Sequence, residues 1–202
     1  MPEEKIYIKN DSLIIEALLD KASGEEGVVI CHPHPQMGGS MNNNVVDALQ
    51  QAYAAANYST LKFNFRGVGG STGAYDDGIG EQEDIFAVRT YMEKLGLTKL
   101  YLAGYSFGAW VGAKILEESR NHFAGSVCVS PPINLLSFNW DSLINKIDLI
   151  ICGDLDQFCP VDVLIQQAQL INAPVEIIRG ADHFYQGKEK ELTRTLIKHI
   201  AQ

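Results

Sequence analysis

Six short apolar runs, separated by helical patterns, constrain the fold of this chain more than any other feature of its sequence. Their hydrophobicity is continuous rather than alternating, which is typical of parallel strands buried on both faces of a sheet. The runs span 27–32, 59–65, 99–105, 126–130, 148–153 and 174–180. Amphipathic helical patterns separate most of them or follow the last one, at 43–56, 81–95, 107–118, 161–171 and 188–200. This alternation predicts an α/β fold, with a doubly wound, mostly parallel sheet flanked by helices.

The first 20 residues carry a different pattern. The segments "KIYIK" and "LIIEALL" flank a turn at Asn10-Asp11, which predicts a β-hairpin at the N-terminal end of the fold. No linker, internal repeat or low-complexity tract interrupts the rest of the chain, and 202 residues are enough for one well-cored domain. We therefore predict a single domain over residues 1–202.

Charge and composition exclude several classes of partner. The net charge of −9, with no basic patch, argues against binding to nucleic acid or to an anionic membrane. No apolar run approaches the ~18 residues of a membrane-spanning helix, and the segment "MPEEKIYIKND" is too polar for a secretory signal. The cysteines lack the CxxC spacing of zinc ribbons and thioredoxin motifs. We expect a cytoplasmic protein with reduced cysteines.

The segment "KLYLAGYSFGAWVGAKI" carries the chemistry-bearing motif, G-x-S-x-G, at residues 104–108. An apolar strand pattern runs directly into the motif, and an amphipathic helix pattern runs directly out of it. A serine on such a strand–turn–helix is held with its Oγ exposed above the sheet, where it can act as a nucleophile. The alternative is a glycine-flanked helix start in which Ser106 only caps the helix.

A serine nucleophile needs an adjacent base, which a third group must orient. In this architecture the acid and then the base follow the serine along the chain. The histidines after Ser106 are His122, His183 and His199. His199 lies on the final predicted helix among surface-type residues, and His122 precedes a strand, at the wrong end of the sheet. His183 follows an apolar strand and is predicted to be the base.

Two carboxylates are candidates for the acid. Asp154 and Asp156 both follow the strand predicted at 148–153, at its carboxyl end. Asp156 lies further into the loop and is better placed to turn toward His183. The alternative for either is a turn or capping carboxylate before Pro160.

The segments "CHPHPQMGGSMNNN", "LKFNFRGVGGSTGAYDDGIG", "GYSFG", "GDLDQFCP" and "ADHF" together resemble the α/β-hydrolase superfamily. The chain looks closest to small bacterial serine hydrolases related to dienelactone hydrolase-like esterases. The acid of that superfamily usually falls in G-x-x-D followed by proline, which implies Asp156, and its final histidine corresponds to His183. "FNFRGVGGS" is similar to a loop that is generally structural there. A phosphate-binding role for this loop is disfavoured, because Thr72 replaces the third glycine of G-x-G-x-x-G.

Catalysis of this kind also needs two N–H donors for the developing oxyanion. The amide of Phe107, after the nucleophile, is the first, and the loop "HPHPQMGG" supplies the second. Since the two prolines have no N–H, we predict His34, with Gln36 and Met37 as alternatives. The imidazoles of the loop orient it or line the pocket, and a metal site is disfavoured because Asp156 and His183 belong to the triad.

Residues 131–147 leave room for one short helix between two strands, so we expect little or no lid and an open site. The pocket is expected to include Met37, Tyr105 and Trp140. Phe107, Phe138 and Phe184 are further candidates, and core packing is the alternative for these aromatic residues. An open site suits small acyl esters, thioesters or lactones better than long lipids.

These patterns predict a serine hydrolase that uses neither cofactor nor metal. Ser106 would attack an acyl carbonyl of a small-molecule substrate, His183 would take its proton, Asp156 would hold the imidazole, and water would hydrolyse the acyl-enzyme. The alternatives are a catalytically silent binding protein of the same fold, or a peptidase or lactonase.

Overall fold

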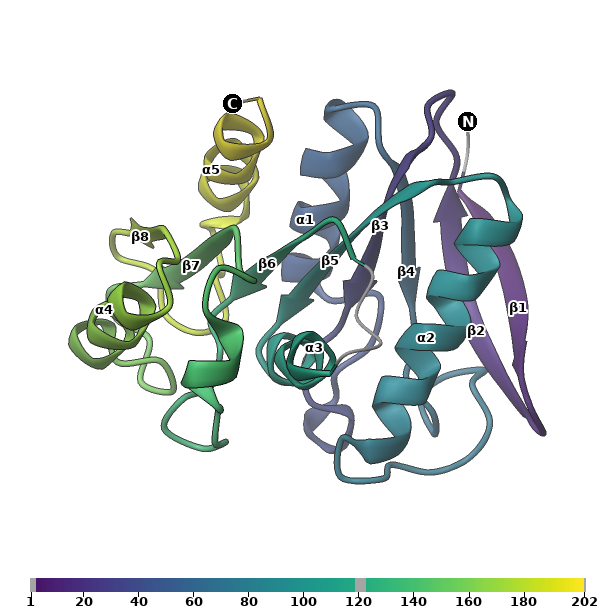
Figure 1. The fold of residues 1–202 in the computed structure, drawn as a ribbon, viewed down its shortest axis with the longest axis horizontal. Coiled ribbons are helices and arrows are strands. Elements are labelled where there is room, and N and C mark those ends of the chain that lie inside the picture. The colour runs from purple at the N-terminus through teal and green to yellow at the C-terminus, as the bar shows by residue number, and fades with distance from the viewer. Residues whose placement is uncertain (1–2, 119–122, 202) are drawn as a thin grey trace.

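The computed structural model describes residues 3–118 and 123–201 and contains an eight-stranded sheet (Figure 1). The strands are ordered β1-β2-β4-β3-β5-β6-β7-β8 across the sheet. They span Glu4–Asn10 (β1), Leu13–Asp20 (β2), Glu26–Cys31 (β3), Ser59–Phe63 (β4), Lys99–Tyr105 (β5), Gly125–Val129 (β6), Leu149–Gly153 (β7) and Val175–Ile178 (β8).

The sheet is mostly parallel, as the sequence predicts. The strands from β4 to β8 in the sheet order pair parallel to one another. β1 and β2 form the predicted hairpin, and β2 also pairs antiparallel with β4, so the hairpin makes one edge of the sheet. The prediction of a mostly parallel sheet with an N-terminal hairpin is confirmed.

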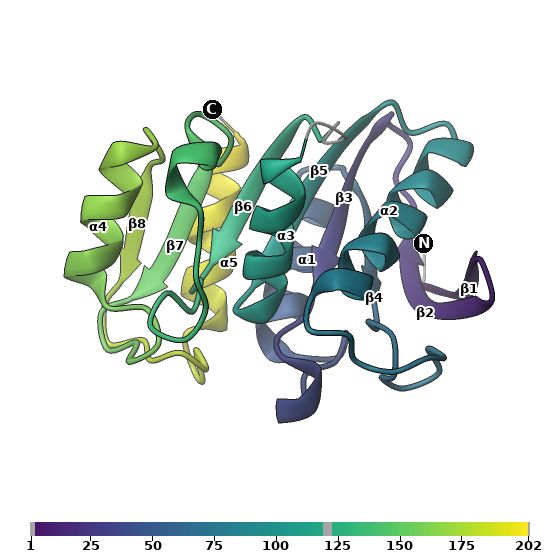
Figure 2. The same cartoon turned by 60° about the horizontal axis from the view of Figure 1, so that its bottom comes forward.

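Helices cover both faces of this sheet. α1 and α5 lie on one face, and α2, α3 and α4 lie on the other (Figures 1 and 2). Their bounds are Asn44–Ala55 (α1), Ile79–Lys94 (α2), Phe107–Glu117 (α3), Val161–Leu170 (α4) and Glu189–Ile200 (α5). In the described part of the chain, no helix has the length and apolar character needed to cross a membrane.

The two-sided core explains why the strand runs are continuously apolar. In β3, Val28 and Ile30 face the cluster under α1 and α5, whereas Val29 and Cys31 face the cluster under α2 and α3. β4, β6 and β7 are buried at every position. A strand covered on both faces gains from apolar side chains at all positions, so the pattern loses its period of two.

The helix α2 begins at Ile79, earlier than its hydrophobic pattern indicates. The carboxylate of Glu81 accepts the amide of Gly78 at 2.8 Å and that of Asp76 at 3.0 Å. It thereby satisfies the amides just before the helix, which a search for apolar periodicity does not register.

The segment between β6 and β7 holds one short 3₁₀ helix, η2 (Trp140–Leu143). Another, η1 (Pro35–Met37), follows β3. The expectation of little or no lid over the carboxyl ends of the strands is confirmed.

Candidate active site

Ser106 lies at the sharp turn between β5 and α3. Its backbone is left-handed (φ 54°, ψ −117°), a conformation that a non-glycine residue adopts at a cost. A Cβ at Gly104 would overlap the carbonyl oxygen of Gly108, so the turn is this tight only because residue 104 is glycine. The Ser106 hydroxyl caps no amide of α3, which argues against the capping alternative.

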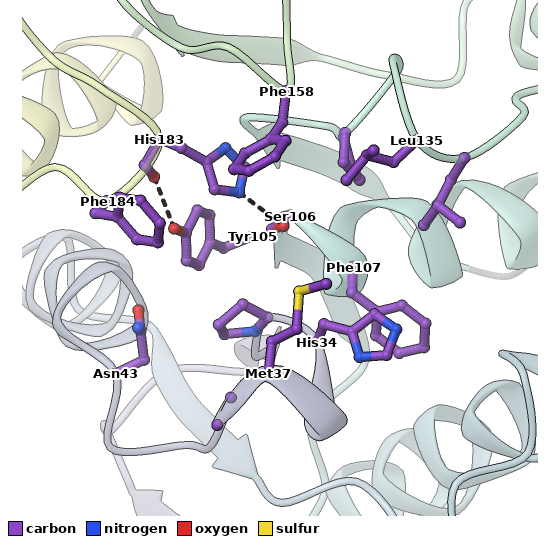
Figure 3. A pocket seen from close by; sticks show the side chains of 15 residues that line it. His34, Met37, Asn43, Tyr105, Ser106, Phe107, Leu135, Phe158, His183 and Phe184 are labelled. Carbon is purple, nitrogen blue, oxygen red and sulfur yellow. Dashed lines mark hydrogen bonds between the residues drawn. The ribbon is translucent and has the colours of Figure 1, made fainter.

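The Ser106 hydroxyl instead contacts His183. Its Oγ lies 2.9 Å from Nε2 of the imidazole (Figure 3). His183 comes from the loop after β8, and both side chains are largely buried. The phenol of Tyr105 donates to the backbone oxygen of His183 at 2.7 Å, and the ring of Phe158 lies edge-on against the imidazole, with centroids 4.8 Å apart. Tyr105 therefore holds the backbone of His183, and Phe158 packs against its ring.

Asp156 contacts the other nitrogen of the same ring. Nδ1 of His183 lies 3.0 Å from Oδ1 and 2.9 Å from Oδ2 of this carboxylate. The amides of Phe158 and Cys159 donate to Oδ1 at 2.9 and 3.1 Å. Burial alone would raise the pKa of Asp156, but the hydrogen bonds from His183, Ser130 and Phe158 outweigh it and hold the pKa below its ordinary value.

These contacts assign the protons in the chain of three residues. An ionised Asp156 only accepts, so Nδ1 of His183 carries its hydrogen and donates it. The lone pair of Nε2 then faces Ser106, whose hydroxyl donates to it. This is the arrangement in which an imidazole can remove the serine proton.

The other candidate acids and bases lie elsewhere. Asp154 accepts the amide of Gly180 at 2.6 Å and ties the loops after β7 and β8 together. His199 lies on α5 in the surroundings of Asp148. His122 lies outside the described residues.

The loop after β3 presents the predicted oxyanion amides. The amide of Met37 donates to His34 O at 3.0 Å, and that of Gln36 donates to Nδ1 of His34 at 3.2 Å, so both alternatives are engaged within η1. Among the hydrogen bonds of the described residues, the amides of His34 and Phe107 donate to no protein acceptor. These two amides are therefore free to bind a substrate oxygen.

His32 is buried beneath this loop and holds one of its peptide groups. Its Nε2 accepts the amide of Phe65 at 3.0 Å, so the hydrogen is on Nδ1, which donates to Pro33 O at 2.6 Å. Burial lowers the pKa of His32 to about 4, which keeps the ring neutral in this role. Carbonyl and N–H of a trans peptide point in opposite directions, so fixing Pro33 O also fixes the direction of the His34 N–H.

The glycine-rich loop after β4 helps to hold the loop after β3 in place. Asn64 accepts the amide of Met41 at 2.8 Å and donates to the buried Glu16 at 2.7 Å. The same carboxylate of Glu16 accepts the amide of Gly70 at 2.6 Å, so this amide is already bound to an anion. The guanidinium of Arg66 is tied to the buried Asp84. The loop is structural, as the resemblance implied.

A cavity of about 570 Å³ opens in front of Ser106. Its walls are largely apolar, and Met37, Leu135 and Phe184 are exposed at its mouth (Figure 3). The described residues that line it include neither lysine nor arginine. They are Pro33, His34, Met37, Gly38, Gly39, Asn43, Tyr105, Ser106, Phe107, Pro132, Leu135, Leu136, Phe158, His183 and Phe184.

The predicted pocket is corrected at one residue. Met37 and Tyr105 line the cavity, but Trp140 does not. Trp140 stacks on Phe138 with ring centroids 5.0 Å apart, and both pack against the core cluster between α3, α4 and the sheet. Large aromatic side chains gain more from burial in this core than from exposure at an open mouth.

The sequence reasoning missed the wall that Pro132, Leu135 and Leu136 form, together with Phe158. One signal was present: residues 132–136 follow the carboxyl end of β6 directly and so start at the edge of the sheet where ligands bind. Among the described residues, no three His, Cys, Asp or Glu side chains are grouped so that they could hold a metal ion.

Known proteins share this architecture. The profile of the alpha/beta hydrolase fold matches residues 28–149. An uncharacterized protein of Rickettsia prowazekii is 31% identical, over 99% of this chain and 89% of its own length. Among solved structures, an alpha-beta serine hydrolase homologue from Coxiella burnetii is 35% identical, with a TM-score of 0.88 over 98% of this chain and 97% of its own.

A serine hydrolase without a lid from Xanthomonas campestris is 25% identical, with a TM-score of 0.85 over 100% of this chain and 94% of its own. The structural likeness therefore extends over nearly the whole chain. The chain belongs to the alpha/beta hydrolase fold family.

Proposed function

We propose that this protein is a serine hydrolase that cleaves small, uncharged acyl esters or thioesters through an acyl-enzyme, with Ser106, His183 and Asp156 as its catalytic triad. The continuous chain of contacts from Ser106 Oγ to Nε2 of His183, and from Nδ1 to Asp156, carries the proposal. Its serine hydrolase relatives support the same class of reaction.

In the first half of the reaction, Ser106 Oγ attacks the acyl carbon while its proton passes to Nε2 of His183. Asp156 stabilises the imidazolium that forms, and the amides of Phe107 and His34 bind the negative oxygen. The tetrahedral intermediate then collapses, and His183 returns the proton to the leaving alcohol or thiol. Ser106 is left as an acyl ester.

In the second half, a water molecule gives its proton to His183 and attacks the acyl-enzyme. The second tetrahedral intermediate releases the carboxylic acid, and the proton on His183 restores the Ser106 hydroxyl. The open, apolar cavity supports a short or medium acyl group without charge, because a buried carboxylate would find no cation among the lining residues.

The test compares the protein with Ser106→Ala on p-nitrophenyl acetate and on a panel of acyl esters, thioesters, lactones and aminoacyl amides. Removal of the nucleophile should lower kcat by about 10⁴-fold or more. Ser137→Ala, at an exposed serine, is the matched control and should keep full activity. Unchanged hydrolysis by Ser106→Ala would overturn the proposal.

A fluorophosphonate probe separates a hydrolase from a silent binding protein of the same fold. An activated Ser106 should be labelled in the native protein, and labelling should disappear after denaturation or in Ser106→Ala. A folded protein that the probe does not label would favour the binding protein.

A further inference from the structure

Three residues of the site have backbones of an unusual kind. The described non-glycine residues with positive φ are Asp11, Asn57, Asp77, Ser106, Ser130, Asn145, Asn172 and Tyr185. Asn and Asp tolerate this conformation, because their short polar side chains bond locally. Ser106, Ser130 and Tyr185 are the remaining members of that set, and all three lie at the candidate active site. Strain of this kind persists where the surrounding structure imposes it, commonly at functional sites.

Ser130 immediately follows β6, and its φ is 45°. Its amide donates to Ile151 O in β7 at 2.8 Å, so the backbone is anchored to the neighbouring strand. This turn directs its hydroxyl to the phenol of Tyr185, 2.8 Å away. The Ser130 hydroxyl also acts as a hydrogen-bond partner that lowers the pKa of the Asp156 carboxylate. Ser130 and Tyr185 are both completely buried.

The chemistry of the groups sets the direction of these hydrogen bonds. The carboxylate of Asp156 only accepts, so the Ser130 hydroxyl donates to it. The phenol of Tyr185 then donates to Ser130 Oγ. Burial raises the pKa of Tyr185 well above its ordinary value, so the phenol keeps the proton that this bond requires.

We propose that Ser130 and Tyr185 are positioning residues for Asp156, a buried hydroxyl pair that acts in series to orient its carboxylate and keep it ionised against His183. The proposal rests on the proposed function, because it assigns Asp156 the role of the acid. Neither hydroxyl touches the substrate, so both act on the chemical step through Asp156 and not on substrate binding.

The test uses Ser130→Gly and Tyr185→Phe. Glycine suits the left-handed backbone and removes only the hydroxyl and the strain, and phenylalanine removes only the phenol oxygen. Each variant should lower kcat by about 5- to 50-fold on a small ester, with KM unchanged within twofold. Tyr101→Phe, with its hydroxyl far from the cavity, is the matched control and should keep its kcat.

Two further readouts distinguish positioning from general stabilisation. Since a carboxylate with fewer donors attracts the proton on His183 more strongly, the acid limb of the kcat/KM profile should move to higher pH in both variants. The double variant should be no slower than Ser130→Gly alone, because the two hydroxyls act in series. Tyr185→Phe carries the test by itself should Ser130→Gly fail to fold.

An unchanged kcat and an unchanged pH profile in folded variants would overturn this inference while leaving the hydrolase intact. So would losses that multiply in the double variant without any shift of the acid limb. Absence of both hydrolysis and fluorophosphonate labelling in the wild-type protein would overturn the proposed function, and the inference with it.

Discussion

At the scale of single residues, His32 shows how a side chain that never reaches the cavity can define it. Nε2 of its imidazole accepts the amide of Phe65, and Nδ1 donates to Pro33 O. Both hydrogen bonds require the neutral ring with its hydrogen on Nδ1. The amide of His34 points opposite to the Pro33 carbonyl that His32 holds. The His32 side chain therefore fixes the orientation of the Pro33–His34 peptide plane.

We expect His32→Asn and His32→Gln to differ in activity. Asparagine keeps a donor near the position of Nδ1 and can hold Pro33 O, whereas glutamine carries its amide near Nε2 and cannot. His32→Gln should lose about 10- to 100-fold in kcat, at or below the cost of about 10²- to 10³-fold for an oxyanion donor that is removed outright, with little change in KM. His32→Asn should lose about fivefold or less. Steady-state kinetics on p-nitrophenyl acetate, with thermal melts of both variants, make the measurement.

Equal losses in the two variants would contradict the orienting role, and a loss confined to the melting temperature would reduce His32 to a packing residue. An increase in KM without a decrease in kcat would also count against it, since an oxyanion contact belongs to the transition state.

Sequence reasoning reached some residues of the site and missed others for physical reasons. Ser106 and His183 follow strand ends, and their neighbours in the sequence restrict the turn around them. Ser130 and Phe158 also follow strand ends, but nothing in a one-dimensional pattern says which way such a side chain turns. Trp140 was predicted to line the pocket because it is apolar, but an apolar side chain packs equally well in a core.

At the scale of elements, the start of α3 packs closely against the end of β3. A Cβ on Gly108 would lie 2.5 Å from Cys31 O and 2.7 Å from His32 O, and backbone atoms cannot move aside as a flexible side chain can. This approach brings the amide of Phe107, at the start of α3, next to the loop that carries His34.

Gly108→Ala should therefore destabilise the fold by about 2 kcal/mol or more and lower kcat, because α3 must shift away from the loop after β3. Gly112→Ala, one turn further along, is the matched control. Its Cβ would meet only the side chain of Leu102, at 3.3 Å, and alanine favours the helix by up to about 1 kcal/mol. Urea unfolding and kcat measured on both variants test this contrast; equal stability of the two would refute it.

The strands were the most predictable elements, and the short 3₁₀ helices were the least predictable. Parallel strands buried on both faces have continuous apolar runs, and each predicted run corresponds to a strand. η1 gives no periodic signal, because three residues are too few for one. Its geometry depends on Pro35, on the capping nitrogen of His34 and on left-handed Gly38.

At the scale of the whole molecule, the buried imidazole of His32 links folding to pH. Its pKa is about 4 in the folded protein and about 6.5 in an unfolded chain, so the unfolded state takes up the proton first as the pH falls. The contribution of His32 to stability is complete above about pH 6.5 and decreases toward pH 4, by about 3 kcal/mol in total. Partial burial also lowers the pKa of His34, which acts in the same direction.

The free energy of unfolding in urea should thus decrease between pH 7 and pH 4.5 in the wild-type protein. His32→Asn, which cannot take up this proton, should show a smaller decrease over the same interval. The hydrogen bonds of Asp156 lower its pKa, so its contribution is lost only at more acidic pH and does not interfere. An identical pH dependence in the two proteins would mean that His32 is not the group responsible.

The order of the strands has a consequence for a chain that is still being synthesised. Ser106 and both predicted oxyanion amides come from the segment up to α3, whereas Asp156 and His183 follow β7 and β8. On the proposed function, a nascent chain that has emerged only as far as β6 would carry the nucleophile without the base that activates it. The proposed triad would be complete only once β7 and β8 had joined the sheet, so completion of synthesis would be the step that activates Ser106.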